Sequence, residues 1–418
     1  MPPPSRRSFL TGKKNFTPIA MPHIIEGMVA RWRIFCRTAG SLLVGVLLGI
    51  LMLEPVLRSD TALLPRGMAA PLPVDAPLTD REYEIHYADA DIFYWEASLV
   101  RPPAENQLEA RVRWRTDEFG FPNPAPIPSS VDVVVLGRSY AMGAQAENSW
   151  PDILRSDRGL RVLNLSQTGA GLGQKWDFFR RFGLPRKPRY AVIEILPPMD
   201  ILEYGNPEPW IVERVAFPLA QSVLRKLFPP AAAPSSGGYI YPLTLKFDGG
   251  SAEAVFYSRY LTALTLSAQD WAGSEDWIHF SADLIGMIST IRRDGIVPIL
   301  LFVPTKETVY VPRLISASNL EPALADAGSW KLTGGRLQWS AAATDAGVVR
   351  ADASAAEGLI RDLAAGQSLC LVDPTDAFWQ SILSGVDPFM RYDTHWSAAG
   401  HELVADGLLP ALDSGTCR

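Results

Sequence analysis

Five apolar runs are spaced along the later two thirds of the chain. Residues 133–136 read Val-Val-Val-Leu, and comparable runs cover 161–165, 190–196, 296–303 and 368–372. Uninterrupted runs rich in β-branched residues are typical of strands that are buried on both faces of a parallel sheet. Helical patterns lie between several of them. The alternation predicts an α/β fold with three layers, α/β/α, around a central parallel sheet.

The first apolar run stops at Gly137 and is soon followed by Ser139, and residues 147–154 are expected to form the next helix. A glycine at the carboxyl end of a parallel strand permits a sharp turn, and open α/β sheets bind ligands at this edge. Ser166 follows the second run in the same way. Ser139 is therefore a candidate nucleophile, and the alternative is a serine that only caps a helix.

Near the end of the chain, Asp393 and His395 are two residues apart. In an extended segment both side chains project to one side, so the carboxylate can orient the imidazole while His395 takes a proton from Ser139. His401 falls on a predicted helix and is expected to be structural. The His, Cys and carboxylate positions show no spacing typical of a metal site, and no cofactor is expected.

Residues 203–281 are too many for a simple connection between two strands. We interpret them as an insertion with a hairpin around residues 239–247 and a helix over 254–271. Its aromatic side chains form either a platform for sugar rings or part of the core. They are Trp210, Tyr239, Tyr241, Tyr257, Tyr260, Trp271 and Trp277.

The amino-terminal part of the chain has a different pattern. Residues 38–57 contain one charged residue, Glu54, and at about 1.5 Å per residue they are long enough to form a transmembrane helix. Seven Lys and Arg residues against one Glu precede this segment. This excess predicts a cytoplasmic segment 1–37, a single pass through the inner membrane and an exported, periplasmic body; a cleaved signal peptide is the alternative. Residues 58–110 are interpreted as a linker and lead-in, and 111–418 as the folded domain.

Composition narrows the possible partners. The 418 residues are 47% hydrophobic, enough for a sizeable core, and the formal net charge is -6 at pH 7. No dense basic cluster lies outside the amino terminus, so no nucleic acid partner is expected. Of the three cysteines, Cys370 and Cys417 fall in the predicted exported part. We predict that they pair there, with two free thiols as the alternative.

Three short motifs resemble the blocks of the SGNH, or GDSL-type, hydrolase superfamily, especially its membrane-anchored members that modify envelope polysaccharides. Gly137-Arg138-Ser139 is similar to the first block, residues 164–169 to the second, and Asp393-Thr394-His395-Trp396 to the last. The resemblance implies an SGNH hydrolase-like fold. It also implies that Ser139 is the nucleophile, His395 the base and Asp393 the residue that orients the base.

The chain departs from this family pattern at three positions. Arg138 replaces the usual Asp of the first block, Ser166 replaces the usual Gly of the second, and Met199 replaces the usual Asn of a third block. The resemblance implies an oxyanion hole formed by the backbone N–H of Ser139, a backbone N–H of the second block (Ser166 or Gly169) and the Asn side chain. Met199 cannot replace that side chain, and losing one such donor typically lowers the rate about 100- to 1000-fold.

Two cations near the predicted site have candidate roles. Arg138, beside Ser139, either holds an anionic group of the substrate or pairs with Asp200. Lys306 follows the fourth predicted strand. It either engages an acidic substrate or is a solvated lysine beside Glu307.

These features predict a membrane-anchored serine esterase or O-acyltransferase. It would act through an acyl-Ser139 intermediate on ester groups of a cell-envelope glycan or of an acylated small molecule. The alternative, favoured by Met199 and Arg138, is a non-catalytic glycan-binding or scaffold protein with the same fold in envelope polysaccharide assembly. The sequence does not distinguish hydrolysis from transfer.

Overall fold

The computed structural model of the chain describes residues 80–86, 108–143, 146–202, 204, 239–318, 320–321, 324, 328–340, 346–391, 393–413 and 417, together with Gly45 and Gly49. The chain divides into two compact units, Met1–Val56 and Leu57–Arg418. Gly45 and Gly49 are helical, and the rest of the predicted membrane segment lies outside the described residues. None of the helices in the described part of the chain combines the length and the hydropathy that a membrane crossing requires.

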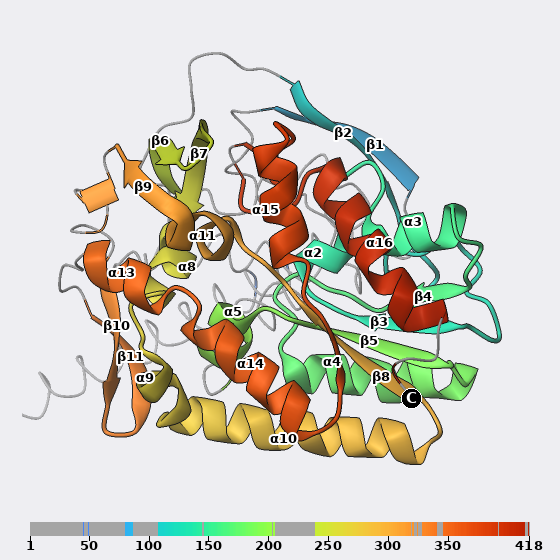
Figure 1. Cartoon of the computed structure of the whole chain (residues 1–418). Helices are drawn as coiled ribbons and strands as arrows, with labels where there is room; N and C mark the ends of the chain where they lie inside the picture. Colours follow the sequence, from blue (N-terminus) through green and yellow to red (C-terminus); the bar gives the residue numbers. More distant parts are fainter. Residues whose placement is uncertain are drawn as a thin grey trace, which may run out of the picture. The chain divides into compact units, whose positions relative to one another are not determined.

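A parallel sheet of five strands forms the centre of the larger unit (Figure 1). Its spatial order is β12-β8-β5-β3-β4, and every neighbouring pair is parallel. The strands are β3 (Val133–Leu136), β4 (Val162–Asn164), β5 (Tyr190–Ile195), β8 (Val297–Phe302) and β12 (Cys370–Val372). Each lies within one of the five apolar runs, so the predicted parallel sheet is confirmed.

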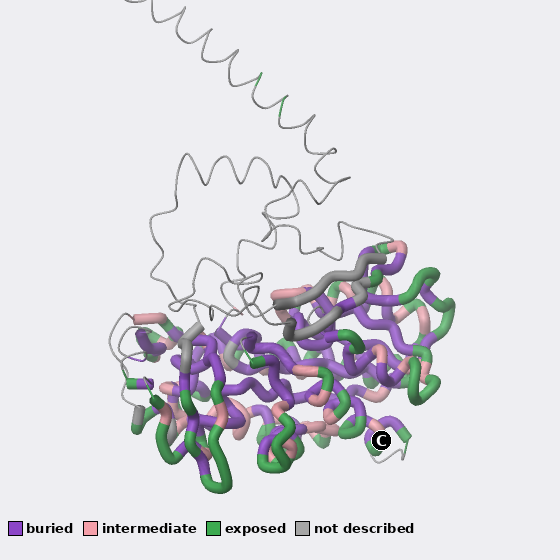
Figure 2. Tube along the Cα trace, turned by 90° about the horizontal axis from the view of Figure 1, so that it is seen from above, coloured by how far each residue is buried: buried purple, intermediate pink, exposed green. Residues whose placement is uncertain are grey.

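Helices cover both faces of this sheet (Figure 1). One face carries α4 (Leu172–Phe178), α10 (Glu275–Arg293) and α14 (Ala355–Gly366). The other carries α3 (Trp150–Ser156), α15 (Thr375–Leu383) and α16 (Ala398–Asp413). Figure 2 shows buried positions running through the middle of this unit, with exposed ones at the outer turns. The three-layer arrangement follows from strands that are apolar on both sides.

The winding direction of the sheet reverses at β3. From β3 the chain first crosses to β4 at one edge of the sheet, and it then returns to β5, β8 and β12 on the other side of β3. Open α/β sheets bind ligands where the winding direction reverses in this way, at the carboxyl ends of the strands. Two short helices begin at this edge, α2 (Ser139–Met142) after β3 and α5 (Pro197–Leu202) after β5.

The insertion differs from the prediction. Its hairpin is longer than expected, because β6 (Tyr239–Phe247) pairs with β7 (Gly250–Tyr257), and β6 also pairs with β9 (Leu314–Ala317). The predicted helix over 254–271 was wrong. Its first residues end β7, and two short helices follow, α8 (Ser258–Ala263) and α9 (Ala268–Ala272). A capping box between Ser267 and Asp270 starts the second helix and divides the predicted one.

Part of the predicted linker is a strand. β1 (Asp80–His86) pairs antiparallel with β2 (Leu108–Arg115). In β1, Tyr83 and Ile85 alternate with charged residues, and this period of two is that of a strand, although the high charge suggested a linker. The antiparallel hairpin of β10 (Ser329–Thr333) and β11 (Arg336–Ser340) was not predicted.

The remaining short helices connect these elements. They are the π-helix η5 (Phe179–Gly183), the 3-10 helices η6 (Leu184–Arg186) and η7 (Val311–Arg313), and the α-helices α11 (Lys306–Tyr310) and α13 (Ala346–Asp352).

The aromatic residues of the insertion belong mainly to the core. Tyr257, Tyr260 and Trp271 are buried, and Trp277 is partly buried against the same cluster. The platform interpretation is therefore wrong for Tyr257, Tyr260 and Trp271, because buried rings cannot stack on a sugar. Trp210 and the side chains of Tyr239 and Tyr241 lie outside the described residues.

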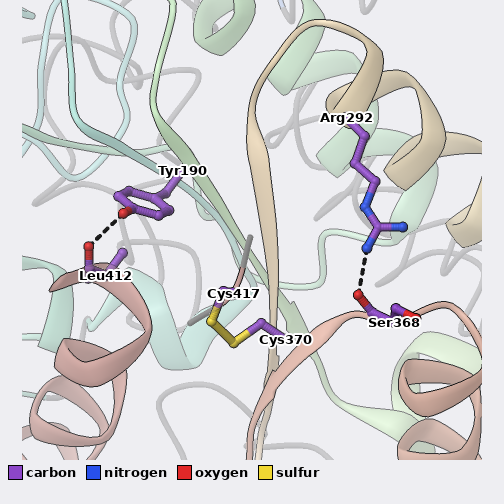
Figure 3. Close-up of a disulfide and its surroundings, with 6 residues drawn as sticks. All are labelled: Tyr190, Arg292, Ser368, Cys370, Leu412 and Cys417. Atoms are coloured by element: carbon purple, nitrogen blue, oxygen red, sulfur yellow. Dashed lines mark hydrogen bonds between the residues drawn. A yellow bond between two sulfur atoms is a disulfide. The ribbon is translucent and has the colours of Figure 1, made fainter. Parts of the chain in front are cut away.

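A disulfide joins Cys370 of β12 to Cys417, as predicted (Figure 3). The two Cα atoms are 5.1 Å apart and 47 residues apart in the chain. Around it, the Tyr190 hydroxyl donates a 2.6 Å hydrogen bond to the Leu412 carbonyl, and Arg292 donates one of 2.7 Å to the Ser368 carbonyl. A cross-link of this span stabilises a fold by about 4 kcal/mol through the unfolded chain's lost entropy. It ties the end of the chain to the edge strand.

Candidate active site

Ser139 is the first residue of α2, directly beyond the carboxyl end of β3. Gly137 permits this turn because a Cβ there would collide with the Glu194 carboxylate and would stand 2.7 Å from both Ala141 Cβ and Ser166 Oγ. The first N–H groups of a helix have no acceptor within it, and the Ser139 N–H therefore faces away from α2. The Ser139 side chain lies at the predicted edge, with 8% of the residue exposed.

His395 and Asp393 meet Ser139 from the other end of the sequence. His395 Nε2 is 2.8 Å from Ser139 Oγ, and its Nδ1 forms a short hydrogen bond to Asp393 Oδ1. The same carboxylate oxygen accepts the His395 backbone N–H at 2.7 Å. All three residues are buried. The predicted trio is thus in contact in the order serine, histidine, aspartate, the arrangement of a nucleophile, its base and the group that orients the base.

The carboxylate of Asp393 is ionised at neutral pH. Burial acts to raise its pKa, but the charge of His395 and the hydrogen bonds that His395 donates outweigh burial and leave the pKa below its ordinary value. An ionised carboxylate accepts the Nδ1 proton. The lone pair of Nε2 then faces the Ser139 hydroxyl, which is the tautomer that a general base needs.

Aromatic contacts hold the segment that carries His395. The Tyr140 ring packs 4.9 Å from the His395 ring and 4.8 Å from the Trp396 ring, measured between centroids. The Tyr140 hydroxyl donates a 3.0 Å hydrogen bond to the Thr394 carbonyl, and the Trp396 indole donates one to the Pro304 carbonyl. The residue after the nucleophile therefore positions the base directly.

The two candidate N–H groups of the second motif differ in their hydrogen bonding. The Ser166 N–H donates a 3.0 Å hydrogen bond to Asn164 Oδ1 within its own turn, so the expectation that it stabilises an oxyanion is wrong. The amide of Asn164 in turn donates to the Ala141 carbonyl at 2.7 Å and fixes this loop against α2. Gly169 has a positive φ of 70°, and its N–H has no hydrogen-bond acceptor among the described residues.

Met199 of α5 is buried among apolar side chains. Its thioether is a weak acceptor and donates nothing. The side-chain donor implied by the family resemblance is therefore missing at this position, as the sequence predicted.

Arg138 is an internal residue and pairs with Asp200. The guanidinium of Arg138 lies 3.0 Å from Asp200 Oδ1, and Lys175 Nζ lies 3.0 Å from Oδ2 of the same carboxylate. Asp200 also accepts the Leu196 N–H at 2.8 Å. Burial lowers the pKa of Lys175. Of the two roles considered for Arg138, the structure shows the pairing with Asp200, and its burial leaves little of it accessible to a substrate.

Lys306 is fully buried and donates a 3.0 Å hydrogen bond to the Arg391 carbonyl. The alternative of a solvated lysine is therefore wrong. Its positive charge also helps to lower the pKa of Asp393, after the larger effects of burial and of His395. Lys306 thus supports the loop that carries Asp393 and His395.

His401 is buried behind the site, as expected of a structural histidine. Burial lowers its pKa to about 3, so it is neutral, and its Nδ1 accepts the Trp150 N–H at 3.2 Å. Among the described residues, no group of three or more His, Cys, Asp or Glu side chains is arranged to hold a metal ion.

Two buried residues around this site carried no sequence signal that we recognised. Lys175 of α4 is fully buried beneath the Arg138–Asp200 pair, and Glu194 of β5 is fully buried beneath the turn at Ser139. A glutamate inside an otherwise apolar strand, Tyr190–Ile195, is the signal that would have found the second.

No protein-family model and no curated protein matches the chain. Solved structures that resemble it include a GDSL-like lipase from Bacteroides thetaiotaomicron, with 10% identity, coverage of 68% of this chain and 88% of that one, and a TM-score of 0.34. An acetyl xylan esterase has 11% identity, 67% and 98% coverage and a TM-score of 0.34. A lipase/acylhydrolase from Enterococcus faecalis has 12% identity, 68% and 96% coverage and a TM-score of 0.32.

Proposed function

We propose that the chain is a serine esterase or O-acyltransferase of the SGNH type. The observation that carries this proposal is the continuous contact from Ser139 Oγ to His395 Nε2, at 2.8 Å, and from His395 Nδ1 to Asp393. It lies at the carboxyl edge of a parallel sheet, where the winding direction reverses. A serine, a base and an orienting carboxylate in this order are the parts that acyl transfer through a covalent intermediate requires.

The reaction follows from this geometry. Ser139 Oγ attacks the ester carbonyl while its proton passes to His395 Nε2, and Asp393 stabilises the imidazolium that forms. The N–H groups of Ser139 and Gly169 are the donors for the oxyanion. The bond between the acyl carbon and the alkoxy oxygen then breaks, and His395 returns the proton to the leaving alcohol. Water or a sugar hydroxyl next attacks the acyl-Ser139 ester and gives its proton to His395. The bond from the acyl carbon to Ser139 Oγ breaks, and His395 returns that proton to Oγ, which regenerates free Ser139.

The substrate and the location are part of the proposal. We infer an acylated glycan of the cell envelope as substrate, because residues 38–57 have the composition of a membrane segment with cationic residues before it. The disulfide between Cys370 and Cys417 supports an oxidising compartment. A topology reporter fused after Arg418 tests the location. Activity of the reporter on the exported side is expected, and a cytoplasmic signal would contradict it.

The experiment on function is hydrolysis of 4-nitrophenyl acetate and release or transfer of acetyl groups on an acetylated glycan by the full-length protein in detergent. We expect ester hydrolysis that disappears in Ser139→Ala. The loss of the side-chain donor at Met199 predicts slow turnover, since one missing oxyanion donor lowers the rate about 100- to 1000-fold. A folded protein without activity on either ester would favour a non-catalytic glycan-binding or scaffold role, for which Met199 is the specific argument.

A further inference from the structure

Glu194 is a fully buried carboxylate that the reaction described above does not use. It lies near the end of β5, the strand that pairs with β3, and no part of its side chain is exposed. Burying an ionisable group among apolar strands destabilises a fold unless other groups compensate. The hydrogen bonds and charges around Glu194 therefore indicate its role.

Among the described residues, the donors to this carboxylate lie on the nucleophile turn and at the start of α3. The Arg138 N–H donates to Oε2 at 2.9 Å, and the Trp150 indole donates to Oε1 at 3.1 Å. The Ala141 N–H donates to the carboxylate as well. Arg138 and Ala141 lie on either side of Ser139 in the chain, and Trp150 begins α3. Three donors suit an ionised carboxylate, which only accepts.

The charges around Glu194 favour its ionised form, whereas burial opposes that form. Lys175 Nζ donates to the Glu194 backbone carbonyl at 2.8 Å and lies between Glu194 and Asp200. Lys175 and Arg138 are balanced by Asp200 and Glu194 only when both acids are ionised. Burial raises the pKa of Glu194 to about 7, and the hydrogen bonds and Lys175 act against that rise.

We propose that Glu194 is a positioning residue of the candidate active site, whose carboxylate holds the Arg138 and Ala141 N–H groups and so fixes the turn that presents Ser139. This inference rests on the proposed function. With the amides on both sides of Ser139 held, the serine Oγ stays 2.8 Å from His395 Nε2 and the Ser139 N–H keeps its direction. Misplacing reacting groups by about 1 Å can lower a rate about 100-fold.

The substitution that tests this role is Glu194→Gln. Glutamine keeps the shape, but its amide has one acceptor oxygen and places an NH2 donor against N–H donors. We expect a 10- to 100-fold lower kcat for ester hydrolysis with little change in KM, because the turn and not the substrate contact is altered. The matched control is Glu307→Gln. Glu307 is equally buried, burial raises its pKa to about 7 as well, and it accepts the Tyr257 N–H of β7.

A second readout does not depend on activity. In full-length protein labelled with 15N-tryptophan, the Trp150 indole resonance, identified by its loss in Trp150→Phe, should shift with a midpoint near pH 7, the value to which burial raises the pKa of Glu194. The shift should persist in Glu307→Gln and vanish in Glu194→Gln. A Trp150 indole resonance that Glu194→Gln leaves in place, or Glu194→Gln activity within about twofold of wild type, overturns the role of Glu194. A wild type that hydrolyses no ester overturns the proposed function itself.

Discussion

The two sides of the candidate active site are held by different kinds of contact. On the nucleophile side, the turn at Ser139 rests on a buried network of charged groups. Its members are Arg138, Lys175, Asp200 and Glu194. On the base side, the His395 segment is held by aromatic packing and backbone hydrogen bonds that several residues share. A buried ion pair fails as a unit when one partner is removed, whereas shared packing is lost in smaller steps. We therefore expect the nucleophile side to be the more sensitive of the two.

The largest effects should come from the reacting groups themselves, one from each side. Ser139→Ala and His395→Ala should each lower kcat for ester hydrolysis by about 10⁴- to 10⁶-fold, and the double variant should be no worse, because the two act as a unit. Steady-state kinetics and a thermal melt of each variant test this. A double variant that loses clearly more activity than either single one would argue against a shared step.

Asp393→Asn should follow, with a loss of about 10⁴-fold in kcat. The amide can donate to Nδ1 and so favour the wrong histidine tautomer, with the proton on Nε2 facing Ser139. Kinetics over a pH range measure this effect. A variant that retains more than a tenth of the wild-type kcat would contradict the role given to Asp393.

Asp200→Asn tests the buried network without touching a reacting group. It leaves Lys175 and Arg138 without their carboxylate, and breaking a buried pair typically costs about 3–5 kcal/mol. Urea unfolding measures this loss. The control is Asp376→Asn, whose carboxylate forms an exposed pair with Arg313 and should change stability by less than about 1 kcal/mol. Equal losses in the two variants would remove the contrast between buried and exposed pairs.

The two sides should also respond oppositely to pH. Burial lowers the pKa of His401, behind the base side, to about 3. It thus contributes stability above its unfolded pKa of about 6.5, and this is lost as pH falls toward 3, by about 1.4 kcal/mol per unit. Burial raises the pKa of Glu194 to about 7, so its contribution is present below about pH 4.5 and is lost as pH rises through 7.

Unfolding free energies measured between pH 4 and pH 8.5 test these two pH dependences. His401→Gln should reduce the change of the unfolding free energy with pH on the acid side only, and Glu194→Gln should reduce it on the neutral to alkaline side only. If either variant reduced this change on the opposite side, the assignment of these two groups would be wrong.

The smallest effect is expected for Tyr140→Phe. Tyr140 follows Ser139 in the chain and contacts the His395 segment, so it joins the two sides. The substitution removes the 3.0 Å hydrogen bond to the Thr394 carbonyl and keeps the ring against His395. One such bond contributes about 1 kcal/mol, so kcat should fall less than about tenfold. Tyr140→Ala, which also removes the ring, should lose more; a similar loss in both variants would assign the effect to the hydroxyl alone.

The strands could be predicted because their information is local. β3, β5 and β8 are runs of mainly apolar residues, and the turn at Gly137 and the spacing of Asp393 and His395 are equally local signals. The capping box that divides the predicted helix of the insertion is also a local signal. Strands with charged residues, such as β1, carry a weaker alternation.

The supports of the site were harder to predict because they depend on long-range contacts. Glu194 meets Arg138 across 56 residues, and Tyr140 meets Thr394 across 254. Whether Arg138 faces a substrate or Asp200, and whether Lys306 is solvated or buried, depends on how the loops after β5 and β8 pack. No spacing in the sequence encodes that packing, so both alternatives remained open until the fold was known.

The most direct test of the central claim is labelling of the full-length protein with a fluorophosphonate, followed by peptide mass spectrometry. A serine activated by His395 should take up one label at Ser139, and His395→Ala should abolish the labelling although Ser139 is still present. Absence of label in a folded wild type, or equal labelling in His395→Ala, would contradict the account of Ser139 as an activated nucleophile.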